Sequence, residues 1–281
     1  MIKTSLAPVL AGLIFWTGVA PSAAQTQAPT SESSAVMPFA DLADLATAAP
    51  MVVVVSVAKA SKVDPARTGP VREGFARTYV EADTKALLSG PGIGAKVKYL
   101  ADVRLIDGKL PKLKKQTMVV FARPVDGRPG ELQLVAPDAQ VPLAQAGEAR
   151  LRTLLHEIVA ANSAPVVTGV RDIHHTPGNL AGEGETQIFL KTASGEPATI
   201  AVLRSPNAPV QWGLSFGELV DAGAGAPPPG TLAWYRLACT LPAKLPASAQ
   251  TATDPGLRQA AARDYALVMQ QLGPCGRQRV F

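Results

Sequence analysis

The clearest pattern along the chain is an alternation of apolar and polar residues over residues 95–105. The odd positions are mainly apolar, and the even positions include Lys96, Lys98, Asp102 and Arg104. A period of two is typical of a β-strand that has one face in a core and the other in water. The pattern therefore predicts a half-buried strand here.

Four further segments in the first half have the composition of strands. Two are continuous apolar runs, one is a longer predicted strand, one is a shorter alternating run, and turns rich in Gly and Pro separate them. These segments are residues 51–57, 77–87, 117–122 and 131–135. Because no helical segment lies between the five strands, they indicate a small antiparallel barrel or sandwich.

Three segments have the spacing of amphipathic helices. The first covers residues 39–47, and the second covers residues 148–161. The predicted buried stripe of the second consists of Leu151, Leu154, Leu155, Ile158 and Val159. The third begins after Asp254, which can cap it, and ends at Gly273-Pro274. Its predicted stripe consists of Leu257, Ala261, Tyr265, Val268 and Leu272.

The second half of the chain also contains strand-like segments. They are residues 166–173, 186–192, 198–203 and 210–216, and the middle two form a predicted hairpin through Ser194-Gly195. We also expect residues 234–239 to be extended. The predicted fold class is mostly β, or α+β, with an antiparallel sheet and helices in the second half.

Residues 50–135 resemble an OB-type barrel, as in netrin-like modules and tissue inhibitors of metalloproteinases. The segments that carry the resemblance are Met51-Val-Val-Val-Val-Ser-Val, Tyr79-Val-Glu-Ala-Asp-Thr-Lys-Ala-Leu-Leu-Ser-Gly90 and Thr117-Met-Val-Val-Phe-Ala-Arg123. The inhibitors depend on an N-terminal cysteine that this sequence lacks, so inhibition is not implied. With this resemblance, we expect an OB-like β-barrel domain over residues 38–145. The strand and helix patterns that follow it predict an α+β domain over residues 146–281.

The whole chain also resembles a family of exported, periplasmic proteins of alphaproteobacterial type. This resemblance includes the segment Leu232-Ala-Trp-Tyr-Arg-Leu-Ala-Cys239. It implies no particular activity.

The first 24 residues have the features of a secretory signal peptide. Lys3 precedes an apolar run over residues 6–19, and Ser22-Ala23-Ala24 form a small-x-small cleavage site before Gln25. The run is too short and interrupted to span a bilayer, which takes about 20 apolar residues. We therefore expect a periplasmic or secreted protein with no transmembrane segment in its mature chain. Residues 25–37, rich in Ser, Thr, Gln and Ala, are predicted to be a disordered leader.

Composition and charge agree with a folded, exported chain. Hydrophobic residues make up 47% of the sequence and charged residues only 17%, which argues against disorder. The net charge is +5, and it becomes +4 when Lys3 is removed with the signal peptide. This modest excess is compatible with attraction to anionic lipids or polymers. Nucleic acid is not an expected partner for an exported protein.

The two cysteines, Cys239 and Cys275, both lie near the C-terminus. In an oxidising compartment a lone pair is most simply a disulfide. It would tie the last helix to residues 234–239. A redox or metal-binding pair is the alternative, although the spacing is far from Cys-x-x-Cys.

Two short motifs contain residue types that could perform chemistry. Gly213-Leu214-Ser215-Phe216-Gly217 matches the nucleophile elbow of α/β-hydrolases, but that triad requires a later histidine. His156, His174 and His175 all precede it. His174 and His175 with Glu183 and Glu185 contain zinc-binding groups, but adjacent strand residues face opposite ways. We interpret this segment as a polar hairpin tip.

A basic cluster provides the remaining candidate site. It consists of Lys109, Lys112, Lys114 and Lys115, just before the strand at residue 117. It is a candidate contact for an anionic partner, which could be an envelope protein, lipid or glycan. The alternative interpretation is ordinary solvated charge on a loop between two strands. The leading hypothesis is a non-enzymatic periplasmic binding protein, and the alternative is a hydrolase of an envelope substrate. No residue is assigned to catalysis, to a cofactor or to a metal.

Overall fold

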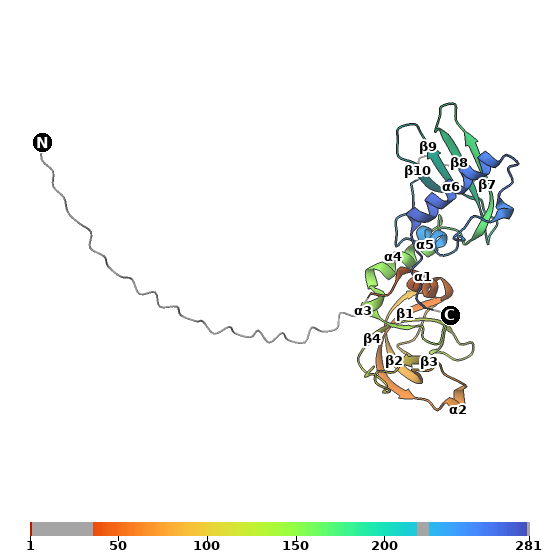
Figure 1. Ribbon diagram of the computed structural model, residues 1–281. Coiled ribbons are helices and arrows are strands. Elements are labelled where there is room, and N and C mark those ends of the chain that lie inside the picture. The colour runs from red at the N-terminus through yellow and green to blue at the C-terminus, as the bar shows by residue number, and fades with distance from the viewer. Residues whose placement is uncertain (2–35, 218–224, 280–281) are drawn as a thin grey trace. The chain divides into compact units, whose positions relative to one another are not determined.

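Five strands in the first half of the chain close into a barrel (Figure 1). The computed structural model describes Met1, residues 36–217 and residues 225–279. The predicted signal peptide, residues 25–35 of the predicted leader and residues 218–224 lie outside the described residues, apart from Met1. The predicted boundary between residues 145 and 146 stays a prediction.

The barrel closes because its first strand pairs on both sides. Its strands are β1 (Met51–Lys62), β2 (Phe75–Ser89), β3 (Lys96–Arg104), β4 (Thr117–Pro124) and β5 (Glu131–Leu134). Their order is β1-β2-β3-β5-β4, and β4 pairs back with β1. The β3–β5 pairing is parallel, whereas the others are antiparallel. A closed five-stranded barrel in a mostly β chain confirms the predicted fold class and is compatible with an OB-type barrel.

Burial along the strands follows the sequence pattern. In β3, Val97, Tyr99, Ala101 and Val103 are buried, as the alternation predicts. The start of β1 is instead buried at every position from Met51 to Val55. There the outer face of the barrel is covered as well, because α1 (Phe39–Ala48) packs on β4 and α4 (Glu148–Val159) packs on β2.

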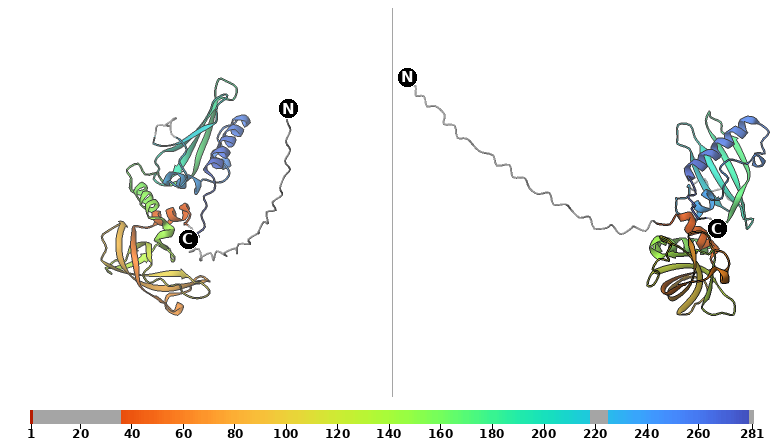
Figure 2. Two further views of the ribbon diagram at one scale, coloured as in Figure 1. Left: turned by 90° about the vertical axis from the view of Figure 1, so that its left-hand side faces the viewer. Right: turned by 60° about the horizontal axis from the view of Figure 1, so that its bottom comes forward.

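The second half contains a four-stranded antiparallel sheet. Its strands are β7 (Val167–Pro177), β8 (Gly184–Thr192), β9 (Ala198–Arg204) and β10 (Gln211–Phe216), in the order β10-β9-β8-β7. Helix α6 (Pro255–Leu272) packs on β7 and β8 and lies along one face of this sheet, as Figure 2 shows in blue. Asp254 caps α6 as predicted, because its Oδ1 atom accepts a hydrogen bond of 2.9 Å from the Leu257 amide.

The prediction that residues 234–239 are extended is wrong. Helix α5 (Leu232–Ala238) covers most of this segment. Its N-terminus is stabilised by two caps, since Thr231 Oγ1 accepts from the Trp234 amide at 3.2 Å and Glu157 Oε2 accepts from the Leu232 amide at 2.6 Å. These bonds satisfy amides that a short helix leaves without partners.

The remaining differences are smaller. Val159 was predicted to be buried, but it is 72% exposed because it is the last residue of α4. The sequence patterns did not predict four short elements. They are α2 (Pro65–Thr68), strand β6 (Gln140–Pro142), which pairs with β4, α3 (Leu143–Ala146) and a 3-10 turn at Ala247–Ala249.

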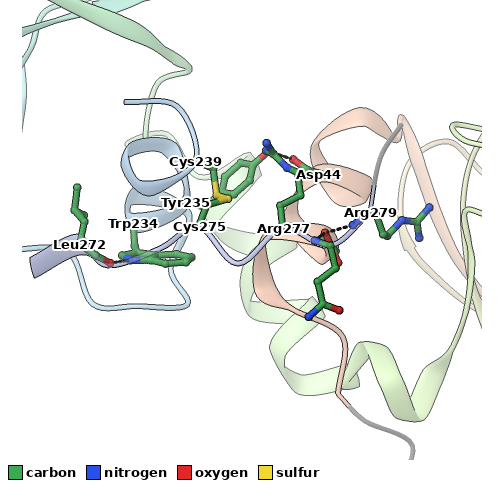
Figure 3. Close-up of a disulfide and its surroundings, with 10 residues drawn as sticks. Asp44, Trp234, Tyr235, Cys239, Leu272, Cys275, Arg277 and Arg279 are labelled. Carbon is green, nitrogen blue, oxygen red and sulfur yellow. Dashed lines mark hydrogen bonds and ion pairs between the residues drawn. A yellow bond between two sulfur atoms is a disulfide. The ribbon is translucent and has the colours of Figure 1, made fainter. Parts of the chain in front are cut away.

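Cys239 and Cys275 form a disulfide, with sulfur atoms 2.12 Å apart (Figure 3). It links the end of α5 to the segment that follows α6. Beyond Cys275 the chain reaches α1, where the Arg277 guanidinium donates to both carboxylate oxygens of Asp44 at 2.6 and 2.8 Å. The amides of Gln278 and Arg279 donate to Asp41 Oδ1 at 3.0 and 3.1 Å. The disulfide therefore fixes the start of a tail that binds α1.

Replacing both cysteines by serine should lower the free energy of unfolding by about 4 kcal/mol, because the unfolded chain loses its cross-link. Urea unfolding of the double variant measures this loss. The wild-type chain in reductant should reach the same midpoint. A loss below about 1 kcal/mol in either experiment would show that the cross-link does not constrain the unfolded chain as the chain-entropy description requires.

Gly90, at the end of β2, should not tolerate a side chain. Its φ is +110°, and a Cβ there would lie 2.7 Å from the Pro50 carbonyl oxygen. Gly90→Ala should cost about 2 to 4 kcal/mol in urea unfolding, because strain and a backbone clash add. Gly92 is the matched control, since nothing lies within 4 Å of a Cβ placed there. Equal stability of the two alanine variants would contradict this account.

Candidate functional site

The loop between β3 and β4, residues 105–116, crosses one end of the barrel. At its start the Leu105 amide donates to the Gly74 carbonyl at 2.8 Å. At its end the Lys115 amide donates to the Val57 carbonyl at 2.8 Å. Between these anchors Leu113 is buried, and Leu110 packs against the same core. The loop is therefore fixed to β1 and to the residue before β2, and its apolar side chains cover the barrel interior.

The tip of this loop is a tight turn. Ile106 and Lys109 exchange two backbone hydrogen bonds of 2.9 Å. Between them Asp107 and Gly108 have φ values of 49° and 73°, as a type I′ turn requires at both central positions. The Ile106 side chain points into solvent and is 62% exposed. The tip is therefore a preformed turn that presents an aliphatic side chain.

Exposed cationic side chains gather around this loop, and we call them the basic end of the barrel. They come from the end of β1, the β1–β2 connection, the end of β3 and the loop itself. The members are Lys59, Lys62, Arg67, Arg72, Arg104, Lys109, Lys112, Lys114 and Lys115, all exposed. The barrel fold therefore gathers cations from four parts of the chain.

The basic end holds the chain's excess positive charge. Residues 57–77 and 102–116, which include Arg77, contain ten cationic side chains and four carboxylates, a net charge of +6. The whole chain has a net charge of +5, so the rest of the sequence has a net charge of −1. One of the four carboxylates, Asp102, is held by Arg77 in bonds of 2.7 and 2.9 Å. This hydrogen bonding raises the pKa of Arg77.

The four lysines expected to contact an anionic partner are all exposed within this end. The structure adds Lys59, Lys62, Arg67, Arg72 and Arg104 to them. Sequence reasoning missed these five because they are separated along the chain and converge only when the barrel closes. A count of charge at the end of each predicted strand could have found Lys59, Lys62 and Arg104. The contact with a partner stays a prediction.

Two hollows on the described part of the barrel are relevant to this site. One, of about 450 Å³, borders the basic end and is lined by Arg72, Phe75, Arg104 and Arg279 among others. Two of its arginines already hold a carboxylate, because Asp138 pairs with Arg279 at 2.6 Å and with Arg72 at 3.5 Å. The other is a groove of about 750 Å³ along β2, β3 and β5. It is mainly apolar, and its charged lining includes the Arg77–Asp102 pair.

The residues weighed as a zinc site do not converge. The His174 ring lies 3.3 Å from Asp172 Oδ1, while the His175 ring lies 2.8 Å from Thr186 Oγ1. Glu183 accepts from the Asn179 and Leu180 amides, and Glu185 accepts from Gln187. Within residues 36–217 and 225–279, no group of three or more His, Cys, Asp or Glu residues could hold a metal ion. Ser215 of the elbow-like motif lies within β10, paired with Thr199 of β9.

A buried polar cluster connects α6 to the sheet, and sequence analysis did not predict it. Thr186 Oγ1 donates to Asp264 Oδ2, and Arg204 Nε donates to Asp264 Oδ1 at 2.6 Å. Because the threonine proton points to the carboxylate, His175 Nδ1 is the donor to Thr186 Oγ1 at 2.8 Å. Asp264 and Thr186 are essentially inaccessible to solvent. The cluster therefore serves to hold the helix on the sheet.

Asp264→Ala should lower the free energy of unfolding by about 3 to 5 kcal/mol, because it removes a buried carboxylate from its partners. Arg152→Gln is the control, since it breaks an exposed pair with Glu148 and should cost about 0.5 kcal/mol or less. Both values follow from urea unfolding. Similar losses in the two variants would contradict the proposed role of the cluster.

Comparison with known proteins gives this chain no family assignment: no protein-family model and no curated protein matches it. The expected membership in a family of exported proteins therefore stays a prediction. A search of the described helices finds none that is both long and apolar enough to cross a membrane.

Proposed function

We propose that this chain is an exported, non-enzymatic binding protein that attaches to an anionic component of the cell envelope. The observation that supports it is the basic end of the barrel, where a net charge of +6 occupies residues 57–77 and 102–116. Like charges brought together repel one another, and folding alone gives no reason to gather them. The positive potential of the basic end would attract an anionic partner. The negative charge of that partner would then reduce the repulsion between the cations.

The form of the basic end favours an extended partner. Seven of its nine cations lie on β1, β3 or the β3–β4 loop, and six of the nine are lysines. A lysine acts as a hydrated point charge, whereas bidentate recognition of one small anion relies on arginine. A surface or a polymer that carries many anionic groups therefore fits better than a single small molecule.

The proposed compartment rests on two further observations. Residues 1–24 have the pattern of a secretory signal peptide, and Cys239 and Cys275 form a disulfide. A disulfide that cross-links the chain suits an oxidising environment outside the cytoplasm. The alternative function is hydrolysis of an envelope substrate. Among the described residues, no arrangement of catalytic side chains specifically supports it.

The test compares two probes, dextran sulfate and neutral dextran, with the chain lacking residues 1–24. We expect binding to dextran sulfate alone, and weaker binding as salt rises, because salt screens exposed charges. Changing Lys109, Lys112, Lys114 and Lys115 together to glutamine should weaken binding at least about tenfold, since the change removes four charges from one surface. Fluorescence anisotropy with labelled polymer measures both effects.

The matched control changes four exposed lysines elsewhere, Lys85, Lys96, Lys191 and Lys244, to glutamine. Both variants lose the same net charge, so only the position of the charges differs. If both variants bound dextran sulfate equally weakly, the polymer would be responding to the net charge of the protein. That result would contradict the assignment of binding to the basic end. Absence of binding to dextran sulfate at low salt would overturn the proposed function.

A further inference from the structure

We infer that the partner at the basic end is a lipid bilayer with anionic headgroups, and that Ile106 enters its interface. This inference rests on the proposed function and names the partner of the same site. Two features of the β3–β4 loop and its surroundings support it. One is the exposed aliphatic side chain at the loop tip, and the other is the set of cations around it.

The loop tip is a rigid turn that presents one apolar side chain. Ile106 is 62% exposed, although an aliphatic side chain gains free energy when it leaves water. The Asp107-Gly108 turn and two backbone hydrogen bonds to Lys109 fix its position. The loop behind it is anchored at Gly74, at Val57 and by buried Leu113. Because the tip is already ordered, insertion would cost little conformational entropy.

Cations flank the tip along the chain, so headgroups would meet them if the tip entered a bilayer. Arg104 and Lys109 are within three residues of Ile106 along the chain, and Lys112, Lys114 and Lys115 follow in the same loop. Lysine stems can lie along apolar surface while their ammonium groups stay in the polar layer. Basic residues near an anionic membrane surface each add to its attraction.

Other anionic partners would contact the cations of this surface but not the exposed Ile106 side chain. A sulfated or phosphorylated glycan would bind the cations but would offer nothing to an isoleucine that projects from a turn. Protein partners usually bury aromatic or arginine anchors in pockets, whereas this tip is a protruding turn. A bilayer interface accepts an apolar side chain together with a surrounding ring of cations.

The test measures sedimentation of the chain lacking residues 1–24 with vesicles. One set contains phosphatidylcholine alone, and the other contains phosphatidylcholine with phosphatidylglycerol. We expect binding to the anionic vesicles only, weakened by salt. Ile106→Ser should reduce the partition coefficient on anionic vesicles by about tenfold, as expected for one aliphatic side chain that no longer enters the interface. The same variant should bind dextran sulfate as the wild type does.

Leu180 provides the matched control. It lies between β7 and β8 in the other half and is also 62% exposed. Leu180→Ser should leave both vesicle and dextran sulfate binding unchanged. Unaltered thermal unfolding of both variants would show that neither substitution acts through stability.

The outcomes separate this inference from the proposed function. Binding to dextran sulfate without preference for anionic vesicles would favour a glycan or acidic protein and overturn the bilayer partner. Equal vesicle binding by wild type and Ile106→Ser would overturn insertion of the tip. Failure to bind dextran sulfate and anionic vesicles alike would overturn the proposed function itself.

Discussion

Strand β1 pairs with β2 along one edge and with β4 along the other, and the barrel closes through this double pairing. Its first five residues are buried on both faces, so the strand contributes to the barrel interior and to the layer under the helices. The same strand extends beyond its pairing with β4 and carries Lys59 and Lys62 to the basic end. Core formation and charge placement therefore depend on one strand.

Closure also explains why the β3–β4 loop can hold so many charges. The loop must cross the barrel end, and Leu113 satisfies that requirement by covering the interior. Once the leucine points inward, the neighbouring Lys112 and Lys114 are left on the solvent side, where both are exposed. Repulsion among the cations is opposed by the backbone hydrogen bonds that anchor the loop, so the charged surface is held without a counter-charge for each lysine.

How much of this could be predicted depends on how far apart the interacting residues lie in the chain. The strands of the barrel and helix α6 follow from local patterns, such as the alternation in β3 and the cap at Asp254. Helix α5 was missed because one of its caps, Glu157, lies 75 residues away from Leu232. The bond between Thr186 and Asp264 spans 78 residues, so nothing local indicates it.

The candidate site shows the same limit. The four loop lysines are neighbours in sequence and were found, whereas Arg72 and Lys59 join them only through strand pairing. The exposure of Ile106 could not be predicted either, because the same residue type in a short loop is as compatible with packing under the loop as with projection from it. In the structure the Asp107-Gly108 turn, with positive φ at both positions, follows Ile106 directly, and the Ile106 side chain is 62% exposed.

The C-terminal tail shows that the barrel is completed by residues far beyond it in sequence. Asp41 is almost fully buried, and its Oδ1 atom accepts from the amides of Gln278 and Arg279. Without the tail, a carboxylate at this position would be buried without those partners, which is costly. The disulfide at Cys275 holds the tail four residues before Arg279, and Arg279 in turn shares Asp138 with Arg72 of the basic end. The cross-link in the second half is therefore connected, through Arg279 and Asp138, to Arg72 of the basic end.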